Sequence, residues 1–174
     1  YCPFYERGLD LLKEGTGKLG YITPNQFMVT DYGKGLRRVL LRDTQLNEVY
    51  DFRDSGVFED ATNYPVILIA EDESDRDARK ENQIRCVRVR GNVDEDSGPS
   101  VDEEIIDSVR EHRDEPGYGD EYIDVFDYPQ SELDENYWSI CPPEERNILN
   151  WLDDNRDSTL SDVVDSVFAG TQTS

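Results

Sequence analysis

The sequence predicts an α/β fold, the second half of a doubly wound sheet followed by a smaller α+β segment. Three observations support this. Apolar residues recur at helical spacing near the N-terminus, and 66–70 is a continuous apolar run of strand length. Beyond residue 70 the chain becomes more polar and its predicted elements shorter. A length of 174 residues suits one ordinary domain, or a partial domain with an appendage.

The first seventy residues predict helices and strands in alternation. Tyr5, Leu9 and Leu12 are spaced i, i+4, i+7, which predicts an amphipathic helix over 4–14 that ends at the turn 15–17. A second helix is predicted over 31–42, with its leucines on one face and its basic residues largely off that face. Strands are predicted over 18–23, 46–52 and 64–70, with the first stopped by Pro24 and the last covered on both faces.

The second half predicts a weaker, mixed pattern. A polar stretch over 71–82 is followed by a half-exposed strand over 84–90 and a loop over 92–100. Further on we expect a charged helix over 101–113, a strand over 122–128 and a helix through Trp151. The shift in composition divides the chain into 1–70, an acidic bridge or insert over 71–137, and a tail over 138–174.

The charge of the chain is strongly negative. Forty acidic residues outnumber eighteen basic ones, the formal net charge is −22, and only four of the basic residues are lysines. This composition resembles that of proteins from halophiles that accumulate salt. Because molar salt screens charges beyond roughly 3 Å, the acid does not exclude a DNA partner. The alternative is a non-enzymatic acidic interaction module, such as a DNA mimic.

Cysteine and histidine usage excludes several kinds of site. Cys2, Cys86 and Cys141 are odd in number and form no C-x-x-C pair, so we expect a reducing cytoplasm and no disulfide framework. His112 is the single histidine, and we expect no metal site. No apolar run approaches the ~20 residues of a membrane span, and no signal-peptide pattern opens the sequence.

Two segments carry a family resemblance, LGYITPNQFM (19–28) and VFEDATNYPVILIA (57–70). With the helix-forming DYGKGLRRVLL and the strand LNEVYDF between them, they resemble the gamma-class DNA adenine-N6 methyltransferases, especially the modification module of type II-G restriction–modification enzymes. The resemblance implies strands 5–7 of a Rossmann-like, S-adenosylmethionine-dependent methyltransferase sheet. It also implies double-stranded DNA as partner, with a nuclease or recognition domain in the same polypeptide.

The resemblance also assigns residues to a target-base pocket. Enzymes that modify a base flip it out of the duplex and stack it on an aromatic side chain. Phe58 matches the stacking aromatic of the family, and Pro24 and Asn25 lie in the strand-end turn that shapes the floor of the crevice. Tyr64 is the rival aromatic, but it adjoins Pro65 and is expected to pack. We further assign Lys34, Arg37 and Arg38 as weak DNA contacts.

The chain departs from the family pattern at two essential motifs. It contains neither the glycine-containing strand–turn–helix that binds S-adenosylmethionine nor an N-P-P-Y-type tetrapeptide. Gly15-Thr16-Gly17-Lys18 follows a predicted helix and precedes a strand, which is the wrong order for a phosphate loop. We therefore expect an internal or C-terminal fragment that holds no catalytic residue, leaves the cofactor site largely outside this chain, and is inactive alone.

A second resemblance covers the tail. Trp138 to Trp151, followed by LSDV (160–163) and FAGTQT (168–173), resembles the entry to the target-recognition region of the same enzymes. An unremarkable helix and strand remain an equal alternative. A small-molecule methyltransferase that shares the sheet is the other alternative, although it has no need of Phe58 as a stacking platform.

Overall fold

The computed structural model describes residues 1–53, 64–90, 92–94 and 98–158, without the side chains of 92–94 and 98–100. By packing, the chain forms two units, Tyr1–Pro142 and Pro143–Ser174, each considered by itself. Within the described part, no helix is both long and apolar enough to cross a membrane.

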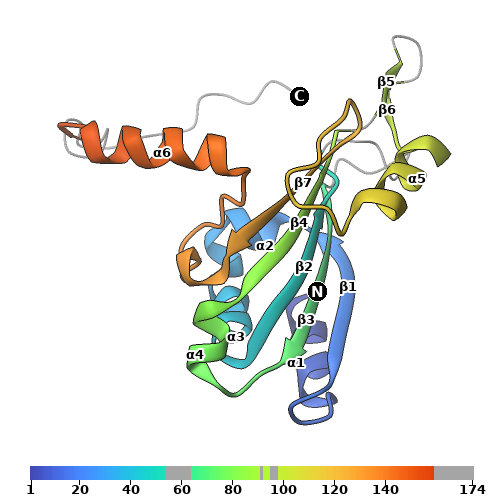
Figure 1. Cartoon of the computed structure of the whole chain (residues 1–174). Helices are drawn as coiled ribbons and strands as arrows, with labels where there is room; N and C mark the ends of the chain where they lie inside the picture. The colour runs from blue at the N-terminus through green and yellow to red at the C-terminus, as the bar shows by residue number, and fades with distance from the viewer. Residues whose placement is uncertain (54–63, 91, 95–97, 159–174) are drawn as a thin grey trace, which may run out of the picture. The chain divides into compact units, whose positions relative to one another are not determined.

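The first unit is built on a mixed five-stranded sheet, and the order of the strands is β1-β3-β2-β4-β7 (Figure 1). β3 runs antiparallel to both of its neighbours, β2 and β4 are parallel, and β7 is antiparallel to β4. The α/β class is confirmed, although the reversed β3 makes the sheet mixed. The strand bounds are β1 Lys18–Pro24, β2 Thr44–Asp51, β3 Pro65–Asp72, β4 Gln83–Val89 and β7 Ile123–Pro129.

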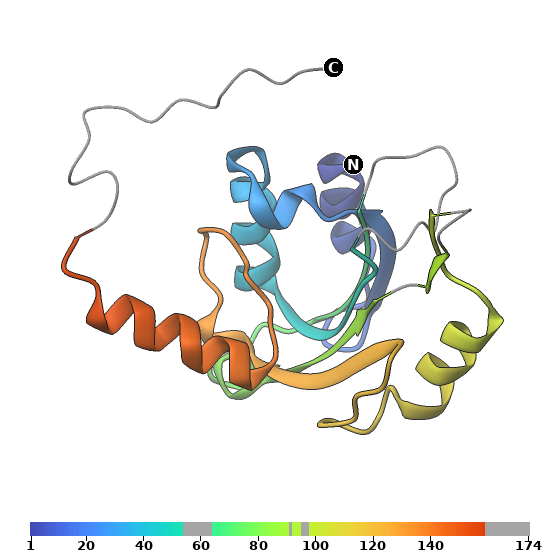
Figure 2. The same ribbon diagram turned by 90° about the horizontal axis from the view of Figure 1, so that it is seen from above.

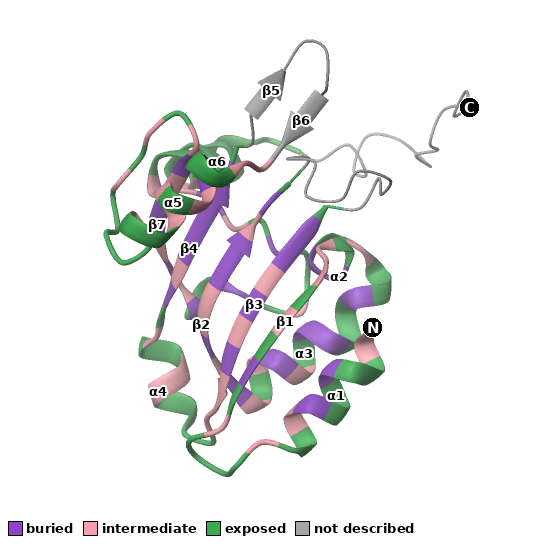
Figure 3. Cartoon of the chain, turned by 90° about the vertical axis from the view of Figure 1, so that its right-hand side faces the viewer, coloured by how far each residue is buried: buried purple, intermediate pink, exposed green. Residues whose placement is uncertain are grey.

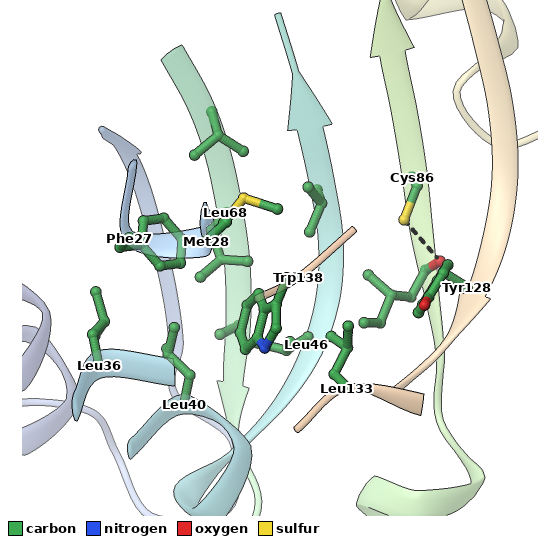
Figure 4. Packing of buried hydrophobic residues seen from close by; sticks show 14 of the residues in the cluster. Phe27, Met28, Leu36, Leu40, Leu46, Leu68, Cys86, Tyr128, Leu133 and Trp138 are labelled. Atoms are coloured by element: carbon green, nitrogen blue, oxygen red, sulfur yellow. Dashed lines mark hydrogen bonds between the residues drawn. The ribbon is translucent and has the colours of Figure 1, made fainter. Parts of the chain in front are cut away.

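Helices near the N-terminus cover one face of this sheet (Figure 2). They are α1 (Cys2–Asp10), α2 (Gln26–Val29), the 3-10 turn η1 (Asp31–Gly33) and α3 (Lys34–Asp43). Phe27 and Leu40 are fully buried between the helices and the sheet, and Trp138 returns from far along the chain to close the same core (Figure 4). The Trp138 ring meets Phe27 edge-on at 6.0 Å, and its backbone N–H donates to the Met28 carbonyl at 2.8 Å.

The opposite face is covered mainly at its β4–β7 side, by α5 (Glu103–His112). Ile105 of α5 is fully buried there, as is Ile123 of β7. On β3, burial alternates, so that Val66, Leu68 and Ala70 are buried whereas Ile67 and Ile69 are only partly buried (Figure 3). Val66, Leu68 and Ala70 belong to the core beneath the N-terminal helices, whereas Ile67 and Ile69 pack against the cluster that contains Ile105. The prediction that this strand is covered on both faces is therefore confirmed, although the second face is covered only in part.

Cross-strand ion pairs set the register of β4 against β7. Arg85 lies opposite Asp127 and Arg88 opposite Asp124, with N–O distances of 2.6 Å and 3.9 Å. Directly opposed charges of opposite sign stabilise a strand pair. The predicted strand is confirmed, but it is mostly buried rather than half-exposed, because it lies inside the sheet between β2 and β7.

A buried glutamine completes the beginning of β2. Gln130 lies in the 3-10 turn η2 (Gln130–Glu132), which packs beside the short helix α4 (Arg76–Glu81). Its side-chain oxygen accepts the Leu46 N–H at 2.9 Å, and its nitrogen donates to the Thr44 carbonyl at 2.9 Å. β2 pairs with β4 only from Glu48 onward. Before that point, the Gln130 amide therefore makes the backbone hydrogen bonds that a neighbouring strand would make.

One basic residue of α3 lies on the buried, apolar face of the helix. Arg37 is 1% exposed and shares the buried face with Leu36 and Leu40, which corrects the expectation for this residue. Its Nε donates to the Glu135 carbonyl at 3.0 Å, and its Nη1 donates to the carbonyls of Phe27 and Thr30. Three carbonyl acceptors explain why this cation is tolerated in the core.

The later part of the chain differs from expectation in two ways. The stretch predicted as a loop over 92–100 contains a two-stranded ladder, β5 (Asn92–Asp94) and β6 (Gly98–Ser100). The predicted division at residue 70 does not coincide with a packing boundary, because β4 and β7 continue the sheet of β1–β3. The second unit contains the predicted helix through Trp151, α6 (Pro143–Asn155), with no buried residue.

Candidate functional site

Three strands end at the same edge of the sheet. β1, β2 and β4 run in one direction, so their carboxyl ends lie together, and the beginning of β3 lies between those of β1 and β2. Pro24 pairs with Pro65 at this edge, and the Asn25 N–H donates to the Tyr64 carbonyl at 2.8 Å. On the other side of β3, the Phe52 N–H donates to the Pro65 carbonyl at 3.1 Å. Open α/β sheets bind ligands outside the carboxyl ends of their strands.

A hollow of about 250 Å³ opens at this edge. It is lined by Asn25, Asp51, Arg53 and Tyr64, which come from the ends of β1 and β2 and the beginning of β3. We call it the carboxyl-edge hollow. Its volume is just below the ~300–1,000 Å³ of pockets that take drug-sized ligands, which suits a smaller planar group.

Arg53 is held in an unusual conformation at the rim of this hollow. Its φ of 46° makes it the one non-glycine residue with positive φ among those described. The Arg53 N–H donates to the Asp51 carboxylate at 3.0 Å, and the two side chains lie 3.8 Å apart as an ion pair. A left-handed arginine costs on the order of 1–3 kcal/mol, and such strain concentrates at functional sites.

The floor of the hollow has an amide side chain available for a ligand. Asn25 precedes α2, but its side chain makes no capping hydrogen bond and has no partner among the described residues. Asparagine offers both a donor and an acceptor, the combination that recognises the adenine N6 and N7 edge. The nearby Thr23 side chain is held by a hydrogen bond, because its hydroxyl lies 3.1 Å from the buried Tyr5 hydroxyl. Burial raises the pKa of Tyr5 to about 12.

Two aromatic residues were considered for the base pocket, and the structure describes only one of them. Phe58 lies outside the described residues. The chain enters the segment that contains it at Arg53 and leaves it at Tyr64, and both of these residues line the hollow. Tyr64 was expected to pack against its surroundings, but its side chain is 50% exposed and faces the hollow. An aromatic side chain is thus available at this site.

The three residues assigned to DNA contact surround one glutamate. Lys34 and Arg38 both bind the Glu135 carboxylate, at 3.1 Å and 2.6 Å, and these cations hold the pKa of that carboxyl below its usual range. Arg37, between them, binds the Glu135 carbonyl instead. The structure therefore groups Lys34 and Arg38 at the surface and places Arg37 in the interior.

Sequence reasoning missed Asp51 and Arg53. The available signal was their position, since Asp51 lies near the end of the predicted strand 46–52 and Arg53 directly follows it, at the edge where Pro24 and Asn25 also lie. The positive φ of Arg53 is invisible in the sequence, because arginine rarely adopts it.

Comparisons with known proteins point to DNA modification. Residues 1–58 match the model of the Eco57I restriction-modification methylase family. The type II restriction enzyme and methyltransferase RM.Eco57I of Escherichia coli is 38% identical over 74 residues, which cover 42% of this chain and 7% of that protein. The type II methyltransferase M.XhoI of Xanthomonas vasicola is 36% identical over 72 residues, covering 41% and 13%. The chain thus spans only a small part of the curated relatives it matches.

Solved structures extend the likeness of fold over most of the chain. The type IIG restriction endonuclease BpuSI aligns with a TM-score of 0.57 at 15% identity, covering 88% of this chain and 17% of that one. A modification subunit of a putative type I restriction enzyme from Vibrio vulnificus YJ016 aligns with a TM-score of 0.59 at 16% identity, covering 85% and 33%. The N-terminal third is therefore homologous to restriction–modification methyltransferases, and the mixed α/β fold is similar to theirs.

Proposed function

We propose that this chain is part of a DNA methyltransferase that transfers a methyl group to N6 of a flipped adenine within a specific sequence. The observation that carries the proposal is the match of residues 1–58 to the restriction–modification methylase family, together with a hollow at the sheet edge where β1 and β2 end. We identify β1, β2 and β3 with the fifth, sixth and seventh strands of the methyltransferase sheet. The order of helices and strands through residue 72 supports this identification.

Within the proposal, the carboxyl-edge hollow is the target-base side of the active site. Phe58 stacks on the flipped adenine, Asn25 hydrogen-bonds to its edge, and Pro24 shapes the strand-end turn that carries Asn25. Tyr64 provides a second aromatic surface at the same place. Stacking of a base on an aromatic side chain contributes ~1–3 kcal/mol, comparable to the cost of unstacking the base from the duplex.

No residue of this chain is assigned to S-adenosylmethionine. Gly15 and Gly17 form the turn from α1 into β1, with the Gly17 N–H donating to the Lys13 carbonyl at 2.7 Å, so they do not follow a strand as a cofactor loop would. We propose that other residues of a longer polypeptide hold the cofactor and the amino group. The 174 residues alone are then expected to be inactive.

DNA contacts by α3 are proposed for Lys34 and Arg38. Each is about half-exposed or more, and each can exchange its Glu135 partner for a phosphate oxygen. For Arg37, buried carbonyl contacts support a structural role instead, although its contact with DNA was proposed from the sequence. In the tail, the elements assigned to target recognition, 160–163 and 168–173, lie outside the described residues.

Genomic methylation tests the proposal in the native host. Deleting the gene segment that encodes these residues should abolish N6-methyladenine at one sequence motif, read by sequencing of native DNA. Phe58→Ala in the same gene should lower the methylated fraction at that motif because the stacking surface is lost. Lys13→Ala, on the exposed α1–β1 turn, is the matched control and should leave methylation unchanged.

Unchanged methylation after the deletion would overturn the proposal. Both alternatives, the acidic DNA mimic and the small-molecule methyltransferase, predict that result. If the deletion abolishes methylation but Phe58→Ala does not lower it, Tyr64→Ala tests whether the second aromatic is the stacking residue.

A further inference from the structure

A second hollow lies at the opposite edge of the sheet from the carboxyl-edge hollow. It has a volume of about 370 Å³ and lies between the end of α3, the helix α4 and the turn η2. α3 and α4 are both found at this end of the sheet in Figures 1 and 3. We call it the basic hollow, because four of its eight lining residues are cations: Arg42, Arg76, Arg79 and Lys80.

This concentration of positive charge contrasts with the rest of the chain. Only 18 of 174 residues are basic, against 40 acidic, yet no carboxylate lines the basic hollow. The short helix α4 explains the segregation. Arg76, Arg79 and Lys80 are spaced i, i+3, i+4 and therefore share one side of the helix, whereas the acidic Asp77 and Glu81 fall outside the lining.

Three of the four cations have no carboxylate partner among the described residues, namely Arg76, Arg79 and Lys80. Of these, Arg76 and Lys80 are exposed. Arg42 is paired with Asp43 at 2.6 Å, whereas Arg79 donates only to the uncharged Glu73 carbonyl. Like charges brought together without a counter-ion repel one another, so an anion seated among them would relieve this repulsion.

The walls of the basic hollow suit a discrete anionic group. Leu41 and Leu133 give it apolar sides, and η2 contributes the Ser131 side chain at its rim. The floor is fixed, because the Gln130 amide is already bound to the backbone of Thr44 and Leu46. The planar donors of arginine match phosphate oxygens in pairs.

We propose that the basic hollow is a phosphate-binding site. Its ligand chemistry is the phosphate oxyanion, supplied either by a free polyphosphate-bearing molecule or by the backbone of nucleic acid. The proposal does not depend on the methyltransferase assignment, because it rests on charges and contacts at the other edge of the sheet.

Calorimetry on the 174-residue chain at low salt tests the site with two probes, inorganic tripolyphosphate and a short DNA duplex of arbitrary sequence. The double variant Arg76→Gln/Lys80→Gln should weaken binding roughly 10-fold, because it removes the two exposed cations that have no carboxylate partner. The matched control Arg7→Gln/Lys13→Gln removes the same charge from exposed positions near α1 and should leave the affinity within about 2-fold of wild type. Circular dichroism checks that both variants fold.

The two probes separate the sources of phosphate. Binding of tripolyphosphate but not of DNA identifies a free phosphorylated ligand. Binding of DNA, with the slope of log affinity against log salt reduced by about 2 in the double variant, identifies the nucleic-acid backbone. The proposal is overturned if neither probe binds, or if both double variants lose affinity equally.

Discussion

At the scale of single residues, adjacent arginines on α3 have opposite roles. Arg37 donates to the carbonyls of Phe27, Thr30 and Glu135 from a fully buried position, whereas Arg38 forms an exposed ion pair. Arg37→Ala should lower the free energy of unfolding by roughly 3 kcal/mol or more, because buried acceptors lose their donor. Urea denaturation monitored by tryptophan fluorescence measures this change.

Arg38→Ala is the control for that substitution. It removes the same side chain one position along the helix, and an exposed ion pair contributes only ~0–1 kcal/mol. Equal losses in the two variants would contradict the structural role assigned to Arg37.

The Tyr5 hydroxyl should make stability depend on alkaline pH. Burial raises its pKa from 10.0 to about 12 in the folded state. The unfolded chain therefore loses this proton first, and the free energy of unfolding falls as pH rises from about 10 toward about 12. Urea denaturation at a series of pH values should show a shallower fall for Tyr5→Phe than for wild type. Identical slopes would show that Tyr5 does not contribute.

At the scale of elements, one turn secures the beginning of a central strand. The Gln130 side chain satisfies the Leu46 N–H and the Thr44 carbonyl, and the Asn82 amide also donates to its oxygen, at 2.9 Å. Gln130→Met keeps the volume but removes these partners, so it should lower the free energy of unfolding by roughly 2–4 kcal/mol. Hydrogen exchange should also show earlier opening of the Leu46 amide.

The exposed Gln83, at the beginning of β4, provides the matched substitution. Gln83→Met makes the same chemical change where no buried backbone group is left without a partner, and its effect should stay within about 0.5 kcal/mol. A Gln130→Met variant as stable as Gln83→Met would refute the bridging role.

At the scale of the whole molecule, self-repulsion should dominate the response to salt. A net charge of −22 disfavours the compact state, and molar salt screens charges beyond roughly 3 Å. The Tm should therefore rise from low to molar KCl, as measured by scanning calorimetry. The triple variant Glu6→Gln/Glu14→Gln/Glu121→Gln, with three exposed carboxylates removed, should show a smaller rise. A rise of the same size in the variant would instead indicate a general effect of salt on apolar burial.

The sequence by itself determined most of the elements in the first unit. Helical spacing located α1 through Tyr5, and the apolar run 66–70 located β3, because both signals are local properties of the chain. The turn at Pro24 and Asn25 was also located in this way, since proline ends a strand. The resemblance over 19–28 and 57–70 indicated the family that the comparisons then matched in residues 1–58.

Only the tertiary structure decided what surrounds each element. Arg37 can be buried because carbonyls of Phe27 and of the distant Glu135 accept its hydrogen bonds. β4 is buried because two other strands lie beside it in the sheet. The carboxyl-edge hollow joins Asn25 to Arg53 and Tyr64, and the basic hollow joins Arg42 to three cations of α4. These arrangements are pairings between distant segments, and local periodicity carries no information about which segments meet. The sequence therefore indicated a base-binding edge, whereas the second, basic edge became visible only when α3, α4 and η2 were brought together.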